Sequence, residues 1–175
     1  RMMAGNVDYT QGAMRNAVKK DFRDIYSSPM SQGTRCHQLA TYIVFDSPLV
    51  MLCDAPTAYR KEPECTRFIA GLPVVADETR ILQGKMGEYI VTARRVGEDW
   101  IVGGLTDWEA RTVDLDLSFL PEGMFRAEIF CDGINADKKG EDYRHEYRDV
   151  KREDRLKMQL APGGGFAIRL KKNHN

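Results

Sequence analysis

Hydrophobic residues follow two different rules along this chain, and the change falls near Pro73. Before Pro73 they recur at helical spacing or form one uninterrupted run, whereas after it they alternate with polar residues. Steps of three and four predict amphipathic helices, and strict alternation predicts strands with one buried face. The pattern therefore predicts a short α/β part over residues 1–73 and an all-β part over residues 74–175.

The first part is predicted to contain a helix, a strand and a second helix. The first helix has its apolar side chains on one face, at Cys36, Leu39, Ala40 and Ile43. It should end before Pro48, because the residue before a proline avoids helical geometry. The apolar run Leu49–Cys53 is typical of a strand buried on both faces in a parallel sheet. The second helix is predicted over residues 63–71.

The second part is predicted to be an antiparallel β-sandwich. In the stretch TVDLDL the apolar side chains of Val113, Leu115 and Leu117 share one face. The stretches EYIVTARRV and DWIVGGLT have the character of two strands joined by a hairpin turn over residues 97–99. About eight short strands with regular turns are expected, which is typical of two packed sheets.

One parallel strand with two helices cannot bury both of its own faces, because a parallel sheet needs neighbours and cover on each side. Residues 1–73 are therefore predicted to be the end of a larger domain, as the last β/α units of a (β/α)8 barrel would be. The fold class is then an α+β fragment: a slice of such a barrel followed by the β-sandwich. In these barrels, site residues lie on the loops that follow the strands.

Charge and hydropathy narrow the possible partners. Lys plus Arg and Asp plus Glu each total 26, so the formal net charge is zero. A nucleic-acid partner would favour a basic chain. No apolar run approaches the roughly 18 residues that a membrane span needs. Neither nucleic acid nor a membrane is expected as a partner.

Cysteine and histidine spacing gives no support for a metal site. None of the four cysteines forms a C-x-x-C pair, and the three histidines are scattered. The cysteines are expected to be free and buried, as unpaired cysteines usually are. A disulfide between Cys53 and Cys65 is the alternative.

The best candidates for a binding site are Asp8, Tyr9 and Thr10, near the start of the chain. A carboxylate beside an aromatic ring can bind a sugar hydroxyl while the ring packs on the sugar. The alternative is a turn in which Asp8 bonds its own backbone. Asp54 is the other carboxylate at an expected strand end. Glycoside hydrolysis needs two carboxyl groups roughly 5–10 Å apart, but no catalytic residue is assigned here.

Other motifs have simpler explanations. His37 has Thr41 at the i+4 position where a second metal ligand would stand, so a structural role is expected. The acidic stretch DGINAD, residues 132–137, lacks the spacing of a calcium loop and is expected to be a turn. Trp100 and Trp108 could form a platform for carbohydrate or could serve core packing.

Many short stretches together resemble one enzyme family. They are RMMAGNVDYTQGAM, SQGTRCHQLATYIVFDSPLVMLCD, PECTRFIAGLP, DET, GEYIVTARR, GLTDW and AEIFCDGINAD, which occur in this order from Arg1 to about Tyr143. In this order they resemble the C-terminal end of glycoside hydrolase family 97, and most closely its α-glucosidase branch. The resemblance implies that residues 1–5 end the seventh barrel strand, with residues 6–12 as the loop that follows and residues 32–46 as the seventh helix.

The resemblance also implies what lies outside this chain. The catalytic carboxylates and the glutamates that hold a calcium ion in that family would precede Arg1, so this piece alone should be inactive and should bind no calcium. A periplasmic location and an α-linked oligosaccharide substrate, from starch breakdown, are likewise implied. Retaining or inverting chemistry, and glucoside or galactoside preference, stay open.

Two further expectations concern assembly. The exposed apolar surface of residues 1–72 should be covered by a second copy in a homodimer, or by rearranged packing against the sandwich. The alternative to a glycosidase fragment is a non-catalytic carbohydrate-binding or interaction module with a β-sandwich core.

Overall fold

A computed structural model describes residues 5–173, so the first four residues, which the resemblance places in a barrel strand, lie outside the described part. The described chain begins with a two-stranded parallel pair and three helices: β1 (Asn16–Ala17), β2 (Ser31–Gln32), α1 (Arg35–Val44), α2 (Pro56–Lys61) and α3 (Pro63–Ala70). Longer strands follow: β3 (Glu78–Lys85), β4 (Tyr89–Val96), β5 (Asp99–Thr106), β6 (Arg111–Asp116), β7 (Phe125–Asp132), β8 (Tyr143–Val150), β9 (Arg155–Leu160) and β10 (Gly165–Lys172).

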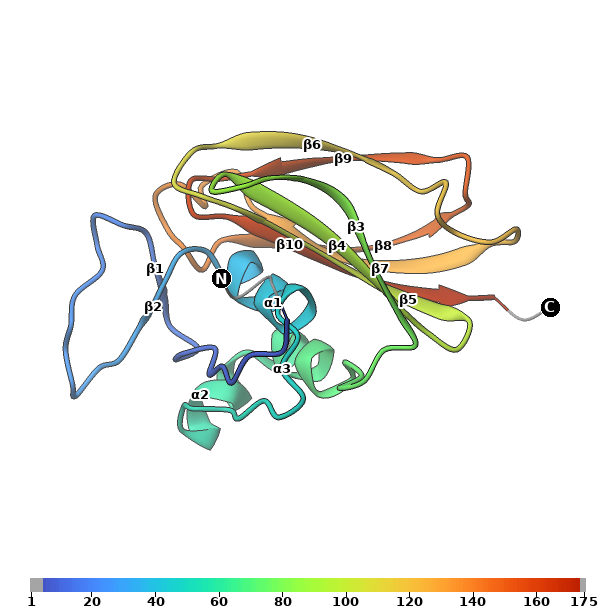
Figure 1. The fold of residues 1–175 in the computed structure, drawn as a ribbon. Helices are drawn as coiled ribbons and strands as arrows, with labels where there is room; N and C mark the ends of the chain where they lie inside the picture. The colour runs from blue at the N-terminus through green and yellow to red at the C-terminus, as the bar shows by residue number, and fades with distance from the viewer. Residues whose placement is uncertain (1–4, 174–175) are drawn as a thin grey trace.

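Six of the strands form one antiparallel sheet in the order β3-β4-β5-β10-β7-β8. The last strand, β10, lies between β5 and β7, at the centre of the sheet (Figure 1). β4 and β5 form the predicted hairpin. Its turn begins at Gly97, whose φ of +59° is left-handed and easily reached without a Cβ.

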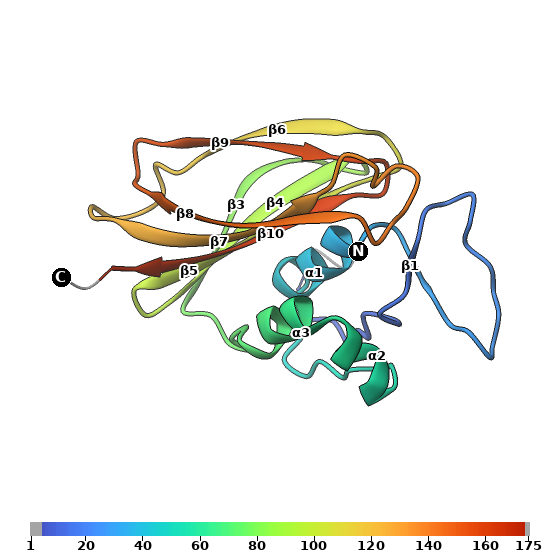
Figure 2. The same cartoon turned by 180° about the vertical axis from the view of Figure 1, so that it is seen from behind.

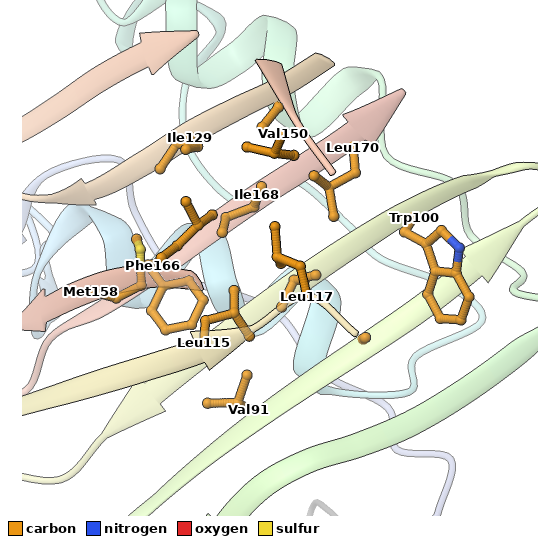
Figure 3. Close-up of a cluster of buried hydrophobic side chains, with 14 of the residues drawn as sticks. Val91, Trp100, Leu115, Leu117, Ile129, Val150, Met158, Phe166, Ile168 and Leu170 are labelled. Carbon is orange, nitrogen blue, oxygen red and sulfur yellow. The ribbon is translucent and has the colours of Figure 1, made fainter. Parts of the chain in front are cut away.

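β6 and β9 form a two-stranded sheet that lies over one face of the six-stranded sheet (Figure 1). Side chains from both sheets meet in one hydrophobic cluster, which includes Val91, Leu115 and Phe166 (Figure 3). The alternation seen in the sequence produces this arrangement, since Val113 is buried while its neighbour Asp114 is exposed. The predicted antiparallel strands are confirmed, and the fragment is mostly β-structure.

The helices cover the opposite face of the six-stranded sheet (Figure 2). Leu39 and Ile43 of α1 pack with Phe130 and Ala167 of the sheet, and Phe68 of α3 completes this second cluster. The cluster joins side chains from both predicted parts of the chain. The two predicted parts, 1–73 and 74–175, therefore share a hydrophobic cluster, and it stays a prediction that they are separate domains.

The predicted helices are present with shorter bounds. α1 begins after Thr34, whose side-chain oxygen accepts a hydrogen bond from the His37 backbone N–H at 3.0 Å. Such a cap satisfies one of the free N–H groups at a helix start. α3 begins at Pro63, as expected for a proline in a first turn. α2 was not predicted, although Pro56 supplies the same signal at its start.

The run Leu49–Cys53 is not a buried strand within residues 5–173. Val50 makes an isolated parallel bridge to Tyr9, and Leu49 and Met51 are 66% and 55% exposed. An apolar run becomes a buried strand only where other elements cover it, and α1 turns its apolar face to the six-stranded sheet instead. The prediction that this helix face covers the run is therefore wrong. Residues 5–173 close no barrel, and a strand buried on both faces stays a prediction for the longer protein.

None of the helices within residues 5–173 combines the length and apolar character that a membrane span requires.

Candidate functional site

The three predicted substrate-binding residues lie on the extended segment that leads toward β1. Asp8 and Thr10 are exposed, while Tyr9 between them is half-buried. The segment runs beside the end of α1, where Val7 N donates a hydrogen bond to the Asp46 carbonyl oxygen at 2.8 Å. Successive side chains of an extended segment point to opposite sides, so Asp8 and Thr10 share the solvent side and Tyr9 faces the protein.

Tyr9 is held against α1. Its ring meets Phe45 edge-on with ring centroids 4.7 Å apart, and its hydroxyl hydrogen-bonds the Thr41 side chain. Burial raises the pKa of the Tyr9 phenol, and the hydrogen bond with Thr41 acts in the opposite direction. The ring thus packs on the helix, and the groups that this segment offers to a ligand are those of Asp8 and Thr10. Their role in substrate binding stays a prediction.

Asp54, the other carboxylate considered in the sequence, serves the backbone. Its Oδ2 accepts a hydrogen bond from Met14 N at 2.8 Å, and its Oδ1 accepts one from Ala55 N at 2.6 Å. The backbone N–H of Asp54 donates to the Tyr59 hydroxyl at 3.3 Å. These bonds make Asp54 a structural group that ties the segment before β1 to the start of α2.

Gln38, on α1, binds the backbone of the segment before β1. Its Nε2 lies 3.2, 3.3 and 3.0 Å from the carbonyl oxygens of Gln11, Gly12 and Ala13. Its Oε1 accepts a hydrogen bond from Asn16 Nδ2 at 3.0 Å. The donors and the acceptor of this buried amide are all satisfied. The amide therefore positions a segment that has no β-sheet hydrogen bonds to hold it.

Arg35 is the second residue that anchors this segment. Its side chain is 1% exposed, and its Nη1 lies 3.1 Å from Glu62 Oε2. Its Nε donates to Asn16 Oδ1 at 2.5 Å, and a further nitrogen donates to the Met14 carbonyl oxygen. A buried guanidinium is tolerated only where it is paired and hydrogen-bonded in this way.

Sequence reasoning missed Arg35 and Gln38. Their signal is the i, i+3 spacing of two long polar side chains on a helix whose inward face is otherwise apolar. Nothing in the sequence indicates their partners, because these lie far away along the chain.

Asp132 lies where β7 ends, beside the start of α1. Its Oδ2 accepts hydrogen bonds from Ala161 N at 2.8 Å and Gly165 N at 3.0 Å. Burial raises the pKa of Asp132 to about 6, against the opposing effect of these bonds and one from the Thr34 side chain. The stretch DGINAD that follows is a turn, as predicted. Asp132 joins β7 to the turn between β9 and β10.

His37 has the structural role expected for it. Its Nδ1 lies 3.1 Å from the Gly164 carbonyl oxygen. Burial lowers the pKa of His37, and the contact with that carbonyl acts in the opposite direction.

The two tryptophans differ. Trp100 is 2% exposed and belongs to the core between the sheets, where it meets Phe119 edge-on. Trp108 is 36% exposed, and the Lys19 ammonium lies 5.6 Å from the centroid of its ring. A Cβ on Gly163 would come within 2.3 Å of the Trp108 ring, so the ring packs on that turn. Trp100 therefore serves core packing. Trp108 packs against Lys19 and the turn at Gly163, with about a third of its surface exposed.

The four cysteines are free, so the alternative of a Cys53–Cys65 disulfide is wrong. Cys36, Cys65 and Cys131 are buried as expected, but Cys53 is exposed together with its neighbours in the run 49–53.

An open cleft of about 1070 Å³ lies beside the β6–β9 pair and the turn after β7. Its lining carries both charge signs, among them Arg111, Asp142 and Lys157. None of the three predicted substrate-binding residues lines this cleft.

The chain belongs to glycoside hydrolase family 97. Residues 75–171 match the family described as glycosyl-hydrolase 97 C-terminal, oligomerisation. The segment that matches includes all strands from β3 to β9 and all but the last residue of β10, and thus the core between the two sheets.

Known proteins of this kind are similar over nearly the whole chain. A retaining alpha-galactosidase of Bacteroides thetaiotaomicron is 57% identical over 171 residues, which is 98% of this chain and 26% of the relative. A probable retaining alpha-galactosidase of Streptomyces bingchenggensis is 27% identical over 95% of this chain and 24% of the relative. The chain thus spans about a quarter of the length of these relatives.

A solved structure has the same fold. A glycoside hydrolase family 97 enzyme from Pseudoalteromonas sp. strain K8, in complex with acarbose, is 38% identical with a TM-score of 0.79. The similarity covers 81% of this chain and 23% of that one. This region is the C-terminal part of a family 97 enzyme.

Proposed function

We propose that this chain is the C-terminal part of a retaining α-galactosidase. The observation that carries the proposal is the 57% identity to a retaining alpha-galactosidase over 98% of this chain. The sequence had favoured an α-glucosidase, and starch or malto-oligosaccharides as substrate. The α-galactosidase relative is more similar than the acarbose-bound structure, at 38%, so the proposal moves to α-linked galactosides.

The chain itself would complete and support the catalytic domain. In this proposal residues 5–73 are the last β/α units of the barrel, with Val50 bridged in parallel to Tyr9 as neighbouring barrel strands would be. Leu49, Met51 and Leu52 are more than half exposed. Earlier barrel strands would cover these side chains, because apolar side chains grouped in this way rarely stay open to water.

The six-stranded sheet would act as a support. It is packed against α1 and α3 through the cluster of Leu39, Phe68 and Phe130. Movement of these helices would displace Asp8 and Thr10, since Gln38 and Arg35 tie the segment that follows them to α1. In this proposal Asp8 and Thr10 hydrogen-bond sugar hydroxyls at the mouth of the barrel.

The proposal includes self-association. The family description names oligomerisation for the segment that residues 75–171 match. We therefore take a homodimer as the assembled form of this part of the protein, in place of the alternative of a free-standing carbohydrate-binding module.

Calcium and a periplasmic location are parts of the proposal for the longer protein. Residues 5–173 bring no three His, Cys, Asp or Glu side chains together in one group. In this proposal the calcium ligands belong to the other part of the longer protein.

The test compares the full-length protein with this chain. The full-length protein should cleave an aryl α-galactoside with a higher kcat/KM than the α-glucoside, and the first product seen by NMR should be the α-anomer. The 175-residue chain should cleave neither. A preference for the glucoside, or a β-anomer as first product, would overturn the α-galactosidase assignment. Turnover by the chain alone would overturn the assignment of its role.

A further inference from the structure

We propose that two copies of this chain associate through the free edge of β8, which pairs with itself as antiparallel strands around a two-fold axis at Tyr147. The proposal rests on the self-association proposed above and assigns it a surface. Strand addition at a sheet edge is a common mode of protein association. A two-fold axis makes the same patch serve both partners.

β8 is a regular edge strand. It ends the six-stranded sheet, and it pairs with β7 without a shift in register from Phe125↔Val150 to Asp132↔Tyr143. An edge strand of this length presents a row of backbone N–H and C=O groups that can bond another strand. β8 therefore has the geometry that pairing requires.

The other edge of the sheet, β3, is closed to such pairing. Its register shifts between Ile81 and Gln83, which bends the strand. Gln83 Nε2 then donates to the Asp114 carbonyl oxygen of β6 at 2.6 Å. The irregularity and this bond draw β3 toward β6, as Figure 1 shows. Of the two edges, β8 is the one left straight.

The two faces of β8 set a limit on self-pairing. Val150 belongs to the core between the sheets, whereas His145 stacks on Phe130 on the helix side. Even-numbered residues therefore lie on one face and odd-numbered residues on the other. Directly opposed residues in an antiparallel ladder lie on the same face of the sheet. A two-fold axis between two residues would oppose adjacent residues, which lie on different faces, so the axis must pass through a residue.

The charges on β8 select among these centres. With the axis at Tyr147, Glu146 of one copy opposes Arg148 of the other at two symmetric points, and no like charges oppose one another. Opposite charges across a ladder stabilise it and like charges destabilise it. Tyr147 itself would lie at the axis. Its side chain is 53% exposed, and its hydroxyl donates to Glu128 Oε1 of β7 at 3.0 Å, so the ring leaves the free edge open.

Neighbouring centres are less favourable. An axis at Glu146 opposes Arg144 to Arg148, and an axis at Arg148 brings its two copies together. An axis at His145 also avoids like charges, but it pairs only residues 143–147 of each strand. The axis at Tyr147 pairs the longer range 144–150. Charged side chains usually deter pairing at an edge. On β8 they deter the adjacent registers and permit the one at Tyr147.

The test is a charge exchange followed by sedimentation velocity at a series of chain concentrations. Glu146→Arg and Arg148→Glu each place like charges opposite one another at two symmetric points, so each should weaken the dimer about tenfold or more. The double variant E146R/R148E restores opposite charges and should return the dissociation constant close to that of the unaltered chain. Lys157→Glu, on the exposed side of β9, is the matched control and should leave the dissociation constant unchanged.

A covalent test uses Tyr147→Cys in a chain whose exposed Cys53 is replaced by serine. Directly opposed residues of an antiparallel pair have Cα atoms about 4.5–5.5 Å apart, within the span of a disulfide, so mild oxidation should give a dimer on a non-reducing gel. The same chain with Lys157→Cys should stay monomeric.

The outcomes separate the two proposals. A chain that stays monomeric at all concentrations would overturn both self-association and its β8 surface. A dimer that is indifferent to the single reversals, or is not restored by the exchange, would overturn the β8 surface alone. Circular dichroism and thermal unfolding of each variant show whether a loss of dimer reflects a loss of fold.

Discussion

Gly103 of β5 lies directly beneath Ile43 of α1, so closely that a Cβ on the glycine would come within 2.9 Å of the Ile43 Cβ. The same Cβ would meet the Ala40 carbonyl oxygen at 3.0 Å. This close approach sets the distance between α1 and the sheet. It thereby also sets the position of residues 11–13, which Gln38 of α1 binds.

Gly103→Ala should therefore destabilise the chain by about 1–3 kcal/mol, the usual cost of adding a methyl group to a full contact. Urea unfolding followed by circular dichroism measures the change. The double variant Gly103→Ala/Ile43→Gly should lose less than the sum of the two single changes, because glycine lacks the Cβ that the new methyl group meets. Strict additivity would show that α1 does not rest on Gly103.

Asp132 should make stability depend on pH in an unusual direction. Its pKa is raised by burial to about 6, above the value of 3.8 for a free aspartate. The protonated form is therefore favoured in the folded chain, so stability is present below pH 3.8 and is lost as the pH rises through about 6. The loss should be on the order of 1–3 kcal/mol.

His37 contributes with the opposite sign, because burial lowers its pKa and stability is lost as the pH falls below 6.5. The comparison that isolates Asp132 is therefore between the unaltered chain and Asp132→Asn, by urea unfolding from pH 4 to pH 8. As the pH rises, the unaltered chain should lose stability relative to the variant, because asparagine does not titrate. A constant difference across this range would contradict the role given to Asp132.

Arg35→Ala should cost about 3–5 kcal/mol, because it leaves Glu62 and the Asn16 side chain without their buried partner. Arg60→Ala, at an exposed position of α2, should change stability by less than about 0.5 kcal/mol. Chemical unfolding of both variants gives the comparison. Equal effects at the two positions would mean that the buried network does not hold the segment.

Thiol labelling should distinguish Cys53 from the other cysteines. Cys53 is exposed and the other three are buried, so a maleimide should modify the native 175-residue chain rapidly at one site, and Cys53→Ser should abolish this reaction. In the full-length protein Cys53 should react far more slowly, because the proposed barrel neighbours would cover the run 49–53. Equal rates in the two forms would argue against that cover.

The segment 74–175, produced on its own, should fold cooperatively, since its two sheets bury one another's apolar side chains. It should melt below the 175-residue chain, because without the helices Phe130 and Ala167 lose their cover. Thermal unfolding followed by circular dichroism tests this. Collapsed amide dispersion in an NMR spectrum would place the domain boundary elsewhere.

The predicted positions of the strands agree with the structure because their signal is local. Val113 and Leu115 are buried while Asp114 is exposed, since a pleated strand with one covered face requires this alternation. The face of α1 could be predicted for the same reason, as the spacing of Leu39 and Ile43 depends only on the pitch of a helix. The presence of a proline at the start of α3 is equally local.

The site was harder to predict. Asp8 and Thr10 lie on the exposed segment expected for them, but Tyr9 faces α1, because the segment is extended and its side chains alternate. Arg35 and Gln38, which hold this segment, carry no signal of their partners. Their bonds cross about twenty residues of chain or more.

By itself the sequence determined the hydrophobic periods, the proline signals at helix ends and the family, because each depends on residues near one another or on many motifs in order. Tertiary structure alone decided where the apolar surfaces go. The run Leu49–Cys53 has the composition of a buried strand and yet is exposed, while α1 lies on a sheet that begins more than thirty residues later. The reason is that hydrophobicity favours burial without naming the partner, and the partner is set by which surfaces are complementary and present in the same chain.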